Sequence, residues 1–147
     1  MVDGNDPGEI AFQVYPIGAV HKRDGEVRIE IYPEYANALL GLKQFSHIIV
    51  LYWFHENDTP DQRRILQVHP CGNEQNPLTG VFATHAPVRP NPIATTLCKI
   101  LSIDGNQITV DDIDAYDGSP VIDIKSYFPH SIPKEEIRVP DWKKEDH

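Results

Sequence analysis

Residues 45–54 read Phe45-Ser46-His47-Ile48-Ile49-Val50-Leu51-Tyr52-Trp53-Phe54, and the stretch contains the longest apolar run of the chain. It is rich in β-branched and aromatic side chains, which favour strands. Because the polar alternation of a half-exposed strand is missing, the pattern is typical of a strand covered on both faces. We therefore expect a central strand of a β-sheet here.

Further strand signals lie on both sides of this stretch. Val27, Ile29 and Ile31 alternate with charged residues, which predicts a half-buried strand. Segments 93–103 and 107–113 predict a hairpin, because the glycine of the intervening Asp104-Gly105-Asn106 supplies the positive φ of a tight turn. Other strands are expected at residues 12–20, 65–68, 81–83 and 121–128.

Proline and glycine punctuate the chain throughout. Thirteen prolines and nine glycines among 147 residues disfavour long helices, and only residues 33–42 show apolar side chains at helical spacing. The expected fold is therefore mainly all-β, a small single-domain β-barrel of about seven strands with one short helix. We expect the barrel domain at residues 8–133 and a polar C-terminal tail at residues 134–147.

Composition narrows the class of protein further. A chain of 147 residues buries about 70% of its unfolded surface, so no metal or disulfide is needed for stability. The apolar runs are too short to span a membrane, and Cys71 and Cys98 are too few for a disulfide framework. These features favour a cytoplasmic protein. The formal net charge of −9 disfavours nonspecific binding to nucleic acids, although it leaves a local basic patch open.

A proline-rich loop at residues 80–93 is the first candidate functional segment. Pro87, Pro90 and Pro92 fix their own φ angles and push the preceding residues toward extended backbone. Arg89 and Asn91 are therefore held on a stiff loop, as recognition of a planar, hydrogen-bonding ligand requires. The alternative is that the prolines only route the chain across one end of the barrel.

An acidic segment at residues 111–125 is the second candidate. Its carboxylates suit a divalent metal, general-base catalysis or a bound cation, although the spacing does not match an EF-hand. The alternative is a simple turn at Asp117-Gly118 flanked by exposed strand ends. The histidines and cysteines show no zinc-ligand spacing, and we expect no metal site.

Six blocks of this sequence, taken together, resemble the TsaA-like family, whose characterised bacterial members (TrmO) are S-adenosylmethionine-dependent tRNA methyltransferases. The resemblance runs from about Val14 to Pro129. The blocks are Tyr15-Pro16-Ile17-Gly18, Gly41-Leu42-Lys43-Gln44-Phe45-Ser46-His47, Phe54-His55, Gly80-Val81-Phe82-Ala83-Thr84, Arg89-Pro90-Asn91-Pro92-Ile93, and Asp117-Gly118-Ser119-Pro120-Val121-Ile122-Asp123-Ile124-Lys125.

This resemblance implies a small β-barrel that binds S-adenosylmethionine and works as a homodimer with cofactor sites near the interface. The implied substrate is a modified adenosine next to the anticodon of tRNA, methylated at N6. The implied cofactor contacts are His55, Glu56, His85, Thr95, Asp114, Ala115, Tyr116 and Asp117. The implied substrate contacts are Arg89, Asn91, Lys125 and Tyr127. Asn91, Asp117 and Asp123 are expected in catalytic roles, with Asp117 or Asp123 accepting the N6 proton.

The sequence departs from the family pattern near the expected site. His85-Ala86-Pro87 stands where Arg-Ser-Pro is common, Ala94 replaces a glycine, and the loop at residues 21–25 is short. A neutral histidine cannot replace the permanent charge and bidentate donors of arginine. Two alternatives therefore stay open: a non-catalytic S-adenosylmethionine- or RNA-binding module of the same fold, and a methyltransferase for a non-RNA substrate.

Overall fold

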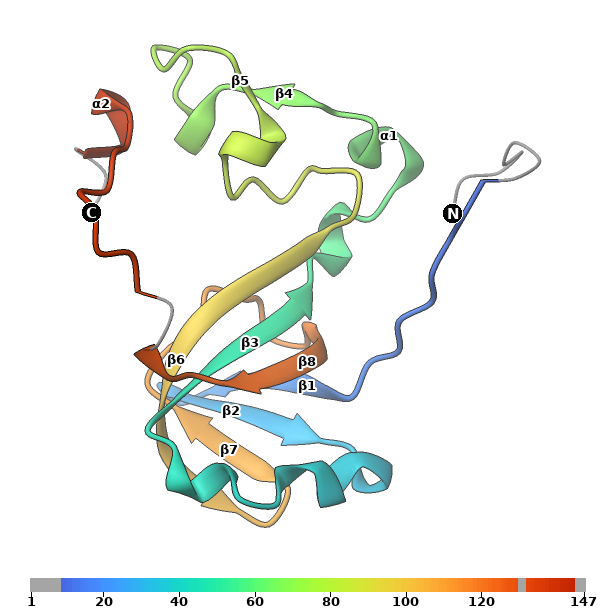
Figure 1. The fold of residues 1–147 in the computed structure, drawn as a ribbon. Coiled ribbons are helices and arrows are strands. Elements are labelled where there is room, and N and C mark those ends of the chain that lie inside the picture. The colour runs from blue at the N-terminus through green and yellow to red at the C-terminus, as the bar shows by residue number, and fades with distance from the viewer. Residues whose placement is uncertain (1–8, 130–131, 145–147) are drawn as a thin grey trace.

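Six antiparallel strands form a closed barrel in the computed structural model, which describes residues 9–129 and 132–144 (Figure 1). The order around the barrel is β1-β2-β7-β6-β3-β8. The strands are β1 (Gly18–Arg23), β2 (Glu26–Ile31), β3 (His47–Trp53), β6 (Ile93–Asp104), β7 (Gln107–Val110) and β8 (Pro120–Ser126). The all-β barrel is confirmed, with six barrel strands rather than the expected seven, because two short strands form a separate sheet.

The core consists mainly of the inward-pointing residues of the barrel strands. Ile48, Val50 and Tyr52 of β3 are buried, whereas the intervening side chains are half-buried. The expectation that both faces of this strand are covered is thus wrong for the single chain, because a barrel has one interior and its outer face remains accessible. Alternating burial in β2 confirms the half-buried strand predicted there.

The hairpin of β6 and β7 is confirmed, with Gly105 in its turn at φ +62°. Two other local expectations are wrong. The strand expected at 12–20 begins only at Gly18, although the backbone of Ile17 already bonds to Val121 and Tyr32, and the segment expected as a strand at 81–83 is a 3-10 turn. The short helix expected at 33–42 is present as the seven-residue 3-10 helix η1 (Pro33–Leu39), and Gly41 follows it at φ +88°. Short apolar runs do not distinguish strands from tight turns.

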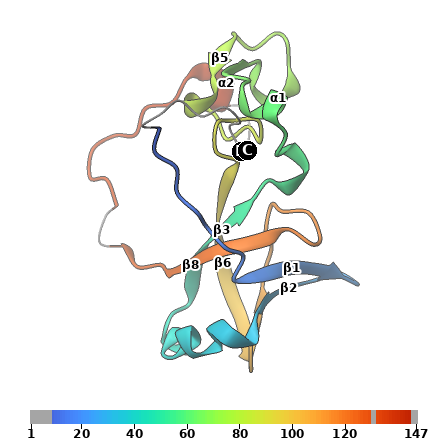
Figure 2. The same ribbon diagram turned by 90° about the vertical axis from the view of Figure 1, so that its right-hand side faces the viewer.

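A small subdomain, which we call the cap (residues 55–92), stands on the ends of β3 and β6 (Figures 1 and 2). The backbone N–H of Phe54 donates to the Pro92 carbonyl at 2.8 Å, and this bond joins the chain segments that enter and leave the cap. Its elements are η3 (His55–Asn57), α1 (Pro60–Arg63), β4 (Gln67–Val68), η4 (Pro70–Gly72), β5 (Thr79–Gly80) and η5 (Val81–Ala83).

The remaining segments lie outside barrel and cap. η2 (Leu42–Gln44) leads into β3, and the tail contains α2 (Asp141–Lys144). The expected boundaries at 8–133 and 134–147 stay predictions, since residues 1–8, 130–131 and 145–147 lie outside the described part of the chain. Within the described part, every helix is too short or too polar to cross a membrane.

We expect the two cysteines to react very differently with a thiol reagent. Cys98 is buried in β6, and burial raises the pKa of its thiol to about 12, whereas Cys71 is exposed. Because the thiolate is the reactive form, Cys98 stays protonated and inert at about pH 8. Ellman's reagent should label one cysteine in the native protein and both in urea. Rapid labelling of both native cysteines would contradict the buried position.

Candidate functional site

The outward side of strands β6, β3 and β8, which we call the outer face, carries several of the expected site residues. In the sheet register, Thr95 of β6 lies opposite Leu51 of β3, which in turn lies opposite Asp123 of β8. Neighbouring strands are about 4.8 Å apart, so Thr95 and Asp123 flank Leu51 at about 10 Å from each other. The register thus gathers residues that are 28 positions apart in the sequence into one row.

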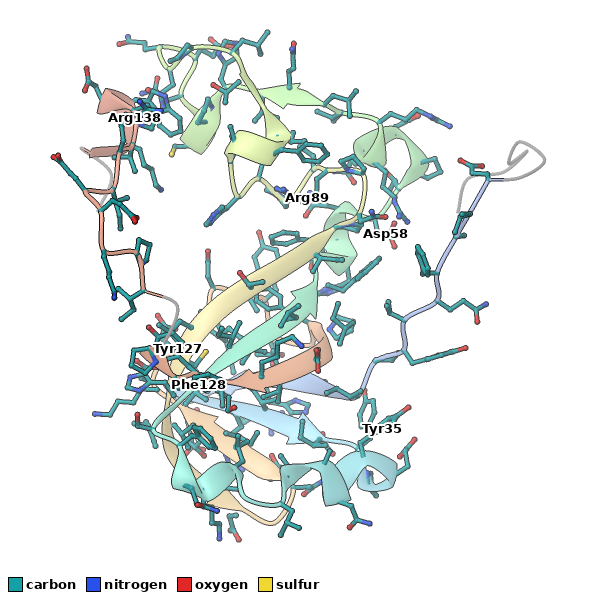
Figure 3. All side chains as sticks on the ribbon, in the orientation of Figure 1. Tyr35, Asp58, Arg89, Tyr127, Phe128 and Arg138 are labelled. Carbon is teal, nitrogen blue, oxygen red and sulfur yellow. The ribbon has the colours of Figure 1, made fainter. Side chains whose placement is uncertain are left out.

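Lys125 and Tyr127 continue the outer face toward the end of β8. Lys125 lies opposite Ile49, and its Nζ is 3.4 Å from Oδ2 of Asp123. The backbone N–H of Tyr127 donates to the His47 carbonyl at 3.0 Å, and the two rings meet edge to face with centroids 6.4 Å apart. Thr95, Asp123, Lys125 and Tyr127 thus share one surface (Figure 3 labels Tyr127 at its margin).

Apolar side chains occupy the rest of the outer face. Ile93, Leu97 and Leu101 of β6 are 39%, 52% and 56% exposed, and Ile49 and Leu51 are half-buried beside them. Contiguous exposed apolar surface on a soluble protein marks an interaction site. The outer face therefore combines polar residues suited to a ligand with an apolar surface suited to another protein.

The loop between β7 and β8 presents the expected cofactor residues in an alternating pattern. Ile113 and Ala115 are buried in the core, whereas Asp114, Tyr116 and Asp117 are exposed. The buried residues anchor the loop at the end of the barrel, so the intervening side chains must face solvent. Ala115 therefore supports the loop from below and can offer a ligand its backbone only.

Lys22 of β1 and Tyr52 of β3 fix this loop from the two strands that flank β8. The Lys22 ammonium donates to the Ile113 carbonyl at 2.7 Å, and its backbone N–H donates to Oδ1 of Asp117 at 2.8 Å. The Tyr52 hydroxyl donates to the Asp114 carbonyl and lies 3.2 Å from the Thr96 hydroxyl. Burial raises the pKa of Tyr52, so the hydroxyl remains a donor.

Two aspartates at the start of the acidic segment have structural partners. Asp111 accepts hydrogen bonds from the backbone N–H groups of Lys99 and Asp112, and these bonds hold the pKa of its carboxyl below the ordinary value. Asp112 accepts from the backbone N–H of Ile113. In residues 9–129 and 132–144, no group of three or more His, Cys, Asp or Glu side chains is placed to hold a metal.

The cap contributes the remaining expected residues. His55 and Glu56 lie in η3, one residue beyond β3, and are exposed, with Nε2 of His55 3.9 Å from Oε2 of Glu56. His85 is also exposed, on the proline-rich loop. Arg89 lies on the side of the cap that faces the barrel (Figure 3), and its Nη1 donates to the carbonyls of Thr84 and Ala86 at 3.2 and 3.0 Å. Arg89 thus stiffens its own loop.

The three residues expected in catalytic roles are held by separate contacts. The side-chain oxygen of Asn91 accepts a hydrogen bond from Arg63 at 3.0 Å. The carboxylate of Asp117 accepts one from the backbone N–H of Lys22, and that of Asp123 accepts one from the backbone N–H of Ile124 at 2.9 Å. Within the described residues, no hydrogen bond or ion pair links these three side chains with one another.

Sequence reasoning missed Tyr52 and Arg63 as residues that position the site. One signal in the sequence could have identified Tyr52. It is a tyrosine at an inward position of the buried strand, and a buried hydroxyl needs a hydrogen-bond partner. No signal in the sequence could have identified Arg63, because only the folding of the cap brings it to its partners Asp58, Pro90 and Asn91.

Known proteins with related sequences and structures identify the family. Residues 11–131 match the family model of the tRNA-methyltransferase O N-terminal domain. The chain belongs to this family. The resemblance inferred from the six sequence blocks is thereby confirmed.

Individual relatives differ in the function that their names state. A probable S-adenosyl-L-methionine-binding protein of Pyrococcus horikoshii is 50% identical over 127 residues, which cover 85% of this chain and 90% of the relative. A mouse tRNA (adenine(37)-N6)-methyltransferase is 35% identical over 102 residues, covering 69% of this chain and 23% of the mouse protein.

A crystal structure of TrmO from P. aeruginosa superimposes with a TM-score of 0.69 at 26% identity. The match covers 91% of this chain but spans only 62% of the length of that chain. The barrel fold is therefore shared with the TrmO family, whereas more than a third of the P. aeruginosa chain has no counterpart in this match.

Proposed function

We propose that this chain binds S-adenosylmethionine and methylates N6 of a modified adenosine next to the anticodon of tRNA. The observation that carries this proposal is that a chain of the TrmO family presents Thr95, Asp123, Lys125 and Tyr127 on one outer face. The names of the P. horikoshii and mouse relatives support the cofactor and the reaction respectively. A cytoplasmic location fits this function and stays a prediction.

The loop at residues 114–117 fits the chemistry of the cofactor. S-adenosylmethionine supplies a methyl group on a sulfonium cation and also carries an ammonium, a carboxylate, a ribose and an adenine. The exposed carboxylates of Asp114 and Asp117 suit the ammonium and the ribose hydroxyls, because ionised carboxylates accept strong hydrogen bonds. Tyr116, which is 66% exposed, offers a ring for stacking.

Asp123 suits the proton transfer that N6 methylation requires. Its side chain is 49% exposed on the outer face, beside Lys125 and in the region expected to meet the RNA. A carboxylate in this position accepts the proton from N6 directly or through water. Positioning supplies most of the remaining acceleration, since orienting two reactants is worth about 7–11 kcal/mol.

We further propose that the functional unit is a homodimer that pairs through the outer face. The second copy would cover the exposed side chains of Ile93, Leu97 and Leu101. It would also bring a second set of site residues to the same surface, which accounts for the separation of Asn91, Asp117 and Asp123 in one chain. Interface cores are enriched in apolar side chains, which Ile93, Leu97 and Leu101 supply on the outer face.

Two measurements test the reaction directly. Calorimetric titration with S-adenosylmethionine should show binding, and labelled cofactor should transfer its methyl group to tRNA that carries the modified adenosine. Binding without transfer would instead favour the non-catalytic module, for which His85 in place of the family arginine is the specific observation. Transfer to a non-RNA acceptor with no transfer to tRNA would contradict the substrate.

Asp117→Asn is expected to weaken S-adenosylmethionine binding at least about tenfold. The asparagine carbonyl can still accept from the backbone of Lys22, so the loop keeps its anchor while the charge is lost. A hydrogen bond to a charged group contributes about 1.5–3 kcal/mol, and 1.4 kcal/mol corresponds to about tenfold in affinity. Calorimetry of both proteins measures the change.

Asp104→Asn is the matched control, because it removes the same charge from an exposed residue at the β6–β7 turn. It should bind the cofactor like the unmodified protein. If the Asp117→Asn variant and this control bound S-adenosylmethionine with equal affinity, Asp117 would not be part of the cofactor site.

A further inference from the structure

Arg63, the last residue of α1, makes three hydrogen bonds, two of which reach the proline-rich loop. Its Nε donates to the Pro90 carbonyl at 2.7 Å, and its Nη2 donates to Oδ1 of Asn91 at 3.0 Å. Its Nη1 donates to Oδ1 of Asp58 at 3.3 Å. The guanidinium thus contacts the backbone of one loop residue and the side chain of the next.

Asp58 and Trp53 tie this guanidinium to the barrel. The second carboxylate oxygen of Asp58 accepts from the Trp53 indole at 2.9 Å, so Asp58 bridges the end of β3 and Arg63. The side chains of Arg63 and Asp58 are only 25% and 32% exposed, which limits the competition from water. Three elements are therefore connected through one arginine (Figure 3 shows Asp58 beside the ends of β3 and β6).

The chemistry of arginine decides how the Asn91 amide is oriented. Arginine carries donors and no acceptor, so the amide can face it only with its carbonyl oxygen. The NH2 group of Asn91 is then directed away from the guanidinium, on a residue that is exposed. Pro90 and Pro92 restrict the backbone on both sides of Asn91, and the bond from Arg63 holds the side-chain amide in this orientation.

We propose that Arg63 is a positioning residue that fixes Asn91 as a hydrogen-bond donor to an acceptor atom of the substrate nucleotide. This inference rests on the proposed function. The acceptor class comprises unprotonated ring nitrogens and carbonyl oxygens, and it excludes the exocyclic N–H group that is to be methylated. Asn91 therefore orients the base and takes no part in removing the N6 proton.

Asn91→Asp separates this role from a merely structural one. Aspartate is isosteric and acceptor-only, and it would form an ion pair with Arg63, so the loop should stay folded and the thermal midpoint should be unchanged or higher. We expect kcat/KM for tRNA methylation to fall at least about tenfold, with unchanged affinity for S-adenosylmethionine. If Asn91 served only the loop, Asn91→Asp would keep full activity.

Arg63→Gln tests the positioning, and Arg64→Gln is its matched control. Arg64 is the next residue, pairs with Asp61 at 3.1 Å and is 73% exposed. Arg63→Gln should lower kcat/KM for tRNA. The double variant with Asn91→Asp should show little further loss of kcat/KM than Asn91→Asp alone, because both changes remove the oriented NH2 donor of Asn91. Arg64→Gln should leave activity unchanged.

Each outcome is decisive. Full activity of Asn91→Asp in a system where the unmodified protein methylates tRNA would overturn the donor role and leave the proposed function standing. Absence of methyl transfer and of anticodon stem-loop binding by the unmodified protein would overturn the proposed function, and this inference with it, before any substitution is made.

Discussion

Gly18→Ala is expected to destabilise the barrel severely. Gly18 is paired on both sides, with Ile31 of β2 and with Val121 of β8, at the seam where β1 closes the barrel. A Cβ atom at this position would lie 2.0 Å from the carbonyl oxygen of Glu30. The clash involves backbone on both strands, so neither side can relieve it by changing a rotamer.

The expected loss of stability is at least about 3 kcal/mol, at the upper end of the cost of overpacking. Domains of this size are stable by about 5–15 kcal/mol, so the variant is expected at the margin of folding. Urea unfolding followed by circular dichroism measures the difference. Gly80→Ala is the matched control, because a Cβ there meets its nearest neighbour at 3.9 Å. A Gly18→Ala protein as stable as the control would contradict the closed seam.

Leu97→Asp is expected to give a monomer with at least about tenfold weaker affinity for S-adenosylmethionine. Leu97 is 52% exposed at the centre of the outer face, so a single chain tolerates aspartate there. In the proposed homodimer the carboxylate would be buried without a partner on both sides of the interface, at a cost of several kcal/mol. Loss of the partner would then remove its contribution to the site.

Sedimentation measures the oligomeric state, and calorimetry measures cofactor affinity. Leu78→Asp is the matched control, since Leu78 is 57% exposed and belongs to the cap rather than to the outer face. An unmodified protein that is monomeric and binds S-adenosylmethionine normally would refute the dimer while leaving the cofactor site intact. A Leu97→Asp monomer with full affinity would show that each chain holds a complete cofactor site.

The strands were predictable wherever local pattern and tertiary contact agree. Val27, Ile29 and Ile31 alternate with polar residues, and the interior of a barrel selects every second residue. The turn at Gly105 was predictable because its positive φ is a local requirement. Residues 81–83 were not, because a three-residue apolar run carries no period, and the cap folds it into a tight turn.

The sequence by itself determined the barrel, the family and the stiffness of the loop that carries Arg89 and Asn91, because alternation, rare-residue blocks and proline are all readable from the chain. Tertiary structure alone decided how the site is built. Strand register placed Thr95 and Asp123 in one row, and the folding of the cap brought Arg63 to Asn91. Register and cap contacts join residues far apart in sequence, whose pairing depends on the packing of the whole core.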